Sequence, residues 1–153
     1  MALLARDKAV FYNDLNSGVG TRVNADGAGT LGSNTNGVAI YTGGTYGSIV
    51  ESLVFSTDDT TAVNAYVYIY TGTTVKPLGI VNIPIQSGDL GTVANVDALA
   101  GSGVTLIGLP INAQGKRYIP LKSGDVLKFS VKAAVTAAKT VYGTAIAFDA
   151  TTP

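Results

Sequence analysis

The chain of 153 residues contains no histidine, no cysteine and no tryptophan. It therefore lacks the commonest general acid–base, the commonest imidazole metal ligand and the thiolate nucleophile. Ser-His-Asp triads, Cys-His pairs and histidine-ligated zinc are excluded. Without cysteine there are no disulfides, so the sequence gives no redox evidence of compartment. We expect a protein that is not an enzyme and that acts by binding through a shaped surface.

Charged residues are scarce, at 13% of the chain, and ten basic residues balance ten acidic ones. This neutrality gives no electrostatic reason to bind nucleic acid or an anionic membrane. The apolar run Met1 to Ala5 is too short for a signal-peptide core or a membrane span. At 46%, the hydrophobic content is typical of a folded chain. We expect a soluble domain that is not secreted by the general route, with neither nucleic acid nor membrane as partner.

Carboxylates are the remaining reactive groups, and they form no recognisable site. The chain has one glutamate, Glu51, and nine aspartates, and no pair shows the spacing across a cleft that a glycosidase needs. Asp58 and Asp59 are typical of a turn, because the alternating acidic ligands of a calcium loop are missing. We expect no catalytic residue, no metal, no cofactor and no small-molecule substrate.

Short runs with β character alternate with turns rich in Gly, Asn, Asp and Thr. Strands are predicted at residues 38–41, 48–56, 65–70, 75–85, 104–109, 117–121, 127–131 and 140–149. One or two helical turns are predicted over residues 92–100. Strands separated by turns at this spacing indicate an all-β fold, an antiparallel β-sandwich of jelly-roll or immunoglobulin-like type.

Two of these strands show which side faces the core. In 65–70 the small and aliphatic residues Ala65, Val67 and Ile69 alternate with a row of tyrosines, Tyr66, Tyr68 and Tyr70. The tyrosine row either packs against a second layer or faces a partner. The last strands alternate as well. Leu127, Phe129 and Val131 face the core opposite a wet face of Lys128, Ser130 and Lys132, whereas Tyr142, Ile146 and Phe148 share one face.

The first 36 residues look different from the rest. Residues 17–37 are mostly Gly, Asn, Thr, Ala and Ser and offer little to bury, while residues 9–12 are briefly strand-like. We predict an extended N-terminal arm over 1–36 and a sandwich body over 37–153, with a long surface loop of a single domain as the alternative. Glu51 interrupts an apolar strand on the face of Ile49, Leu53 and Phe55. It either has a partner such as Arg117 or Lys128, or marks an interface.

Two segments, GSIVESLVFSTDDTTAVNAYVYIY from Gly47 and GLPINAQGKRYIPLKSGDVLKFSVKAAVTAAKTVYGTAIAFD from Gly108, resemble small virion structural proteins of tailed bacteriophages. The resemblance implies a capsid decoration, or cement, protein. Such a protein lies on the outer surface of the phage head, binds the major capsid protein, ties neighbouring capsomers together and often forms a homotrimer. The candidate interface residues are Arg6, Lys8, Phe11, Tyr12, Arg22, Glu51, Tyr66, Tyr68 and Tyr70.

Two other functions fit the same sequence. A tail-fibre, baseplate or receptor-binding β-domain of a phage would share the fold, the neutrality and the trimer, and would display a binding loop. A free-standing carbohydrate-binding module is less favoured, because the chain lacks the tryptophan that best stacks on a sugar ring.

Overall fold

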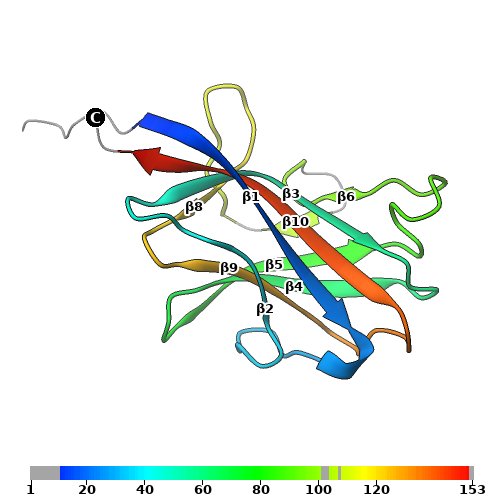
Figure 1. Cartoon of the computed structure of the whole chain (residues 1–153). Coiled ribbons are helices and arrows are strands. Elements are labelled where there is room, and N and C mark those ends of the chain that lie inside the picture. Colours follow the sequence, from blue (N-terminus) through cyan, green and yellow to red (C-terminus); the bar gives the residue numbers. More distant parts are fainter. Residues whose placement is uncertain (1–10, 101–103, 107, 152–153) are drawn as a thin grey trace, which may run out of the picture.

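The computed structural model describes residues 11–100, 104–106 and 108–151, and it is all-β. Two antiparallel five-stranded sheets pack as a sandwich, which confirms the expected fold class (Figure 1). The first sheet contains, in spatial order, β1 (Phe11–Val23), β10 (Thr140–Thr151), β3 (Ser48–Thr57) and β6 (Val96–Asp97), with β8 (Ile119–Leu121) also paired to β3. The second contains β2 (Val38–Thr42), β9 (Val126–Val131), β4 (Val63–Tyr70), β5 (Val75–Ile83) and β7 (Val104–Leu106).

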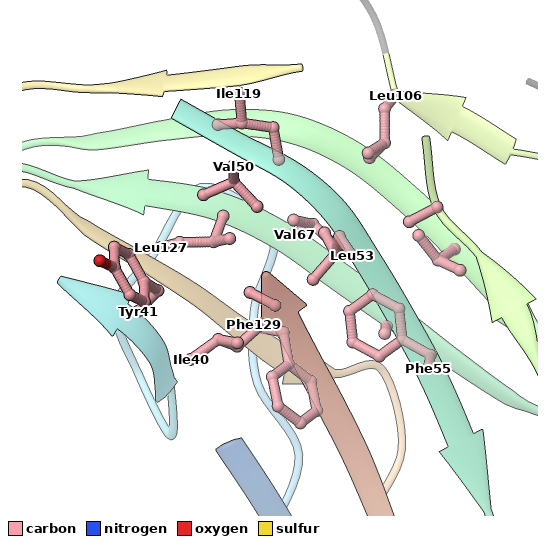
Figure 2. Close-up of a cluster of buried hydrophobic side chains, with 14 of the residues drawn as sticks. Ile40, Tyr41, Val50, Leu53, Phe55, Val67, Leu106, Ile119, Leu127 and Phe129 are labelled. Carbon is pink, nitrogen blue, oxygen red and sulfur yellow. The ribbon is translucent and has the colours of Figure 1, made fainter. Parts of the chain in front are cut away.

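The core lies between the two sheets and is filled by the inward residues of each strand. Leu53 and Phe55 of β3 face Val67 of β4 and Phe129 of β9, and all four are fully buried (Figure 2). The rings of Phe55 and Phe129 meet edge to face with their centroids 5.3 Å apart. This geometry is favourable for aromatic pairs, so the two rings join the sheets at the centre of the sandwich.

The strand alternation predicted the core side of β4 and β9 correctly. Ala65, Val67 and Ile69 are buried, as are Leu127, Phe129 and Val131. The wet face expected for β9 is wrong at Ser130, which is fully buried. A Cβ added at Gly29 would lie 2.3 Å from the Cβ of Ser130, so the segment 24–37 covers this serine directly.

Residues 11–36 belong to the sandwich, contrary to the predicted boundary between an arm over 1–36 and a body over 37–153. The strand β1 pairs with β10 from Phe11 opposite Thr151 to Val23 opposite Thr140. Beyond it, a 3₁₀ turn, η1 (Asn24–Asp26), leads into a segment fixed to the second sheet, where the Gly29 amide donates to the Val131 carbonyl at 2.7 Å. Residues 1–10 of the expected arm lie outside the described part of the chain.

The helical turns predicted over residues 92–100 are also wrong. This stretch contains turns and the short strand β6. Its backbone bonds mainly to neighbouring segments: the Gly88 amide donates to the Val93 carbonyl at 2.8 Å, and the Ala98 amide to the Leu53 carbonyl at 2.8 Å. Pairing with β3 therefore overrides the helical spacing of the apolar residues. No helix in the described ranges is long and apolar enough to span a bilayer.

Candidate interaction surface

The outward side of β1, β10 and β3 is an apolar sheet face that the other described segments leave largely exposed; the segment around Gly88 lies against it only near Ser56. We call it the outer face and define it by thirteen outward positions. These are Leu15, Ser17, Val19, Thr21 and Val23 on β1, Thr140, Tyr142, Thr144, Ile146 and Phe148 on β10, and Ser52, Val54 and Ser56 on β3. Leu15 and Val19 are 65% and 60% exposed, and Tyr142 and Ile146 are 41% and 43% exposed. Figure 1 shows β1 and β10 running side by side across this side of the molecule.

The usual distribution of large and small residues is reversed on these two strands. The inward positions of β10 are small, with Gly143, Ala145 and Ala147 buried against the core. The reason lies in the aromatic pair: a Cβ added at Gly143 would lie 2.9 Å from the Phe55 ring and 3.3 Å from the Phe129 ring. Because other strands already fill the core here, β10 has room only for small side chains at positions 143, 145 and 147, and its large apolar residues at 142, 146 and 148 point outwards.

The same reversal occurs on β1, for a different reason. A Cβ added at Gly18 would lie 2.0 Å from the Ile40 carbonyl oxygen, and one at Gly20 would lie 2.6 Å from that of Ala39. Only glycine lets β1 approach β2 this closely and close the edge of the sandwich. The apolar side chains of β1 therefore contribute nothing to the core of the single chain.

On the outer face, Ile146 and Tyr142 of β10 project between smaller side chains of β1 and β3. Across the paired strands the rows are Ser17, Ile146 and Ser52; Val19, Thr144 and Val54; and Thr21, Tyr142 and Ser56. None of the thirteen positions carries a charge. The outer face is thus an uncharged surface of ridges and hollows, and contiguous exposed apolar surfaces of this kind mark interaction sites.

Hydrogen bonds hold the outer face rigid at both ends. At one end the Asp149 carboxylate accepts from Asn16 Nδ2 at 2.8 Å, from the Tyr41 hydroxyl at 2.6 Å and from Ser48 Oγ at 2.5 Å, which joins four strands. Burial, with the Asp149 hydrogen bond, raises the pKa of Tyr41. At the other end the Asp58 carboxylate accepts from the Thr140 amide at 2.6 Å. A preformed face loses little conformational entropy on docking.

Of the residues predicted from the N-terminal region, only Arg22 has a described side chain. Arg6 and Lys8 lie outside the described residues, and Phe11 and Tyr12 are placed only by the pairing of their backbone with β10. Arg22 is 1% exposed, and its guanidinium donates to the carbonyl oxygens of Gly27 and Asn36. Burial lowers its pKa, and nearby Asp26 partly opposes this effect. Arg22 therefore fastens the following loop instead of forming an exposed interface.

The tyrosine row lies on the second sheet, away from the outer face. Tyr68 is 1% exposed beneath the segment 24–37, where its hydroxyl donates to Asn34 Oδ1 at 3.3 Å, and burial raises its pKa. Tyr66 and Tyr70 are half-buried. The Lys128 ammonium lies 4.9 Å from the centroid of the Tyr70 ring. The sequence predicts that the row either packs against a second layer or faces a partner. Tyr68 does the first, because the segment 24–37 covers it.

Glu51 is exposed at the edge of the outer face, and the expectation that it shares a side with Leu53 and Phe55 is wrong. A β-bulge lies at this point, because Ile146 pairs with Ser52 while Ala147 pairs with Val50. The extra residue shifts the alternation by one. Together with Asp97 and Arg117, Glu51 lines a hollow of about 560 Å³. No ion pair joins Glu51 to Arg117 or Lys128 in the described structure.

The sequence analysis does not identify the outer-face residues of β1, although a signal is present. Leu15, Val19 and Val23 occupy alternate outward positions, but the Gly and Asn residues between them resemble a loop composition. Among the described residues, no group of three or more acidic side chains is placed to hold a metal ion. No protein-family model, curated protein or solved structure matches the chain.

Proposed function

We propose that this chain is a structural virion protein, a decoration protein of a tailed-phage head that assembles with other protein subunits through its outer face. The observation that carries the proposal is the exposed, uncharged and apolar character of this face, whose large side chains on β1 and β10 lie opposite small inward residues such as Gly18, Gly143 and Ala145. Such a face is unfavourable in the isolated chain, because exposing apolar side chains to water costs free energy. Burial of the face against another protein removes this cost and stabilises the complex.

The chemistry of the chain supports adhesion over catalysis. Apolar surface is buried with little dependence on ionic strength, whereas charge pairs weaken as salt screens them. A neutral chain with few charges is suited to a contact that persists through changes of medium. The resemblance of residues 47–70 and 108–149 to small phage virion proteins supports a location on the phage head. A protein at that location implies the major capsid protein as its partner.

Locating the chain in purified virions tests the proposal. We expect cryo-electron microscopy to show its density distributed over the outer surface of the head, and heads lacking the chain to bind the added protein. Attachment should persist when sodium chloride is raised from about 0.1 M to about 1 M, since that change shortens the Debye length from about 10 to about 3 Å. Absence of the chain from the head would contradict the proposal.

A second candidate function, receptor or glycan binding at the phage tail, is favoured by one observation. The hollow beside Glu51 combines carboxylates from Glu51 and Asp97 with cations from Lys116 and Arg117, and Ile111 adds an apolar wall. Polar groups around an apolar patch are typical of small-ligand sites. Density confined to the tail tip, with glycan binding lost in Arg117→Ala, would establish this function in place of decoration.

A further inference from the structure

We propose that the outer face is covered by the same face of further copies of this chain, so that the protein is a homo-oligomer held together by β1, β10 and β3. This inference rests on the proposed function and names the partner of the surface already described. Three properties of the outer face carry it: its relief, its lack of charge and its area.

The relief of the outer face fits a copy of itself. Ile146 lies between Ser17 and Ser52, and Tyr142 lies between Thr21 and Ser56. The row between these two is level, because Thr144 has nearly the same size and shape as its neighbours Val19 and Val54. At one end of the face, Phe148 pairs instead with the large Leu15 and Ile49. A second copy brings the same ridges and hollows on a sheet with the same hand of twist. Two such faces interdigitate in the way that the sheets of a sandwich pack, about 10 Å apart.

The charge distribution also favours a copy over an unrelated partner. A charged group placed against the outer face would lose its hydration without gaining a partner, because none of the thirteen positions is charged. A second outer face brings no such group. The formal net charge of zero also means that copies do not repel one another. Glu51 and Asp97 lie at the edge, where an interface remains wet and tolerates charge.

The area is that of a stable interface. Leu15, Val19, Val23, Tyr142 and Ile146, exposed by 41% to 65%, present on the order of 500 Å² of mainly apolar surface. A standard interface buries about 800 Å² on each partner, and about 65% of it is apolar in homodimers, which amounts to about 500 Å². The outer face therefore supplies the apolar part of one such interface without any other surface.

Light scattering coupled to size exclusion, on the full chain purified without phage heads, tests the inference. We expect a mass of at least twice the chain's 15.6 kDa at micromolar concentration. Ile146→Asp should reduce the mass to that of one chain, because it places a charge at the centre of the contact. The control is Ile85→Asp: Ile85 is 48% exposed in the loop after β5, and this variant should keep the mass of the wild type.

A second variant keeps the test valid if the aspartate prevents folding. Val19→Ser combined with Ile146→Ser removes two ridges and adds no charge, and we expect it to raise the dissociation constant at least tenfold while the far-ultraviolet circular dichroism is unchanged. A wild-type chain with the mass of a monomer overturns the inference, and so does a folded Ile146→Asp variant that keeps the wild-type mass.

The two proposals fail separately. A monomer that attaches to heads through the outer face overturns the inference, leaves the decoration role in place and makes the capsid protein the occupant. An oligomer that dissociates in Ile146→Asp but never attaches to heads overturns the decoration role and supports the inference.

Discussion

Replacing the buried carboxylate of Asp59 should weaken the fold by an amount that its contacts define. Asp59 is fully buried in the turn after β3. Its carboxylate accepts four hydrogen bonds: from the amide and hydroxyl of Thr61, both at 3.0 Å, and from the amide and hydroxyl of Thr136, at 2.9 and 2.7 Å. It therefore ties the turn after β3 to the connection between β9 and β10.

Three of these bonds go to Oδ1 and one, from the Thr136 amide, goes to Oδ2. The variant Asp59→Asn therefore loses at least the bond to Oδ2, and it turns the other three into neutral hydrogen bonds worth about 0.5–1.5 kcal/mol each. Hydrogen bonds to a charged group contribute about 1.5–3 kcal/mol each, so we expect a loss of at least about 3 kcal/mol in the free energy of unfolding. In a domain of this size that corresponds to a fall of about 6–12 °C in Tm. The control, Asp89→Asn, changes an exposed carboxylate and should alter stability by less than about 0.5 kcal/mol.

The pH dependence of this difference gives an independent check. Burial alone would raise the pKa of Asp59, but the hydrogen bonds from Thr136 and Thr61 outweigh it and hold the pKa below its ordinary value of 3.8. A carboxyl with a lowered pKa in the folded state stabilises the fold above its unfolded pKa, and this contribution is lost as the pH falls through the folded pKa. Urea unfolding should therefore show a constant difference between wild type and Asp59→Asn above about pH 5, which shrinks below about pH 4. A difference under about 1 kcal/mol at pH 7, or one unchanged at low pH, would refute this reasoning.

Three further changes test other parts of the structure. Phe129→Ala removes a fully buried ring in contact with Phe55 and should cost about 3–5 kcal/mol in urea unfolding; a smaller loss would mean that the core closes around the gap. Gly29→Ala places a Cβ against Ser130 and should cost about 1–3 kcal/mol, so wild-type stability would show that the 24–37 segment is not fixed there. Deleting residues 2–36 removes β1 and should yield insoluble protein, whereas deleting residues 2–10 should leave cooperative unfolding intact, since the pairing with β10 begins at Phe11. A soluble, cooperatively folded chain lacking residues 2–36 would restore the arm as a separate unit.

The sequence predicts the strands whose alternation coincides with burial. In β4 and β9 the aliphatic and aromatic residues at alternate positions face the core, so Val67 and Phe129 could be assigned from pattern alone. The strand β1 could not be assigned in this way. Its inward residues are Asn16, two glycines and Arg22, and it becomes a strand through its long pairing with β10. Local composition does not record such tertiary pairing.

The candidate surface was predictable only in part. The alternation in residues 140–149 groups Tyr142, Ile146 and Phe148 on one face of the strand. A two-residue alternation alone, however, does not tell which of the two faces points into the core. That choice depends on the volume available in the core, where Phe55 and Phe129 exclude larger residues from β10. The bulge at Glu51 shows the same limit, because one inserted residue reverses the side of everything that follows it.

Covering of the outer face in the working assembly is the central claim, and thiol labelling measures it directly. The chain has no cysteine, so Val19→Cys creates a single thiol on the outer face, and Ser123→Cys creates one at an exposed turn outside it. We predict that a water-soluble maleimide labels Ser123→Cys fully in the assembled protein, while Val19→Cys is protected and becomes reactive when Ile146→Asp is added. Equal and rapid labelling of both thiols in the assembly would contradict the account.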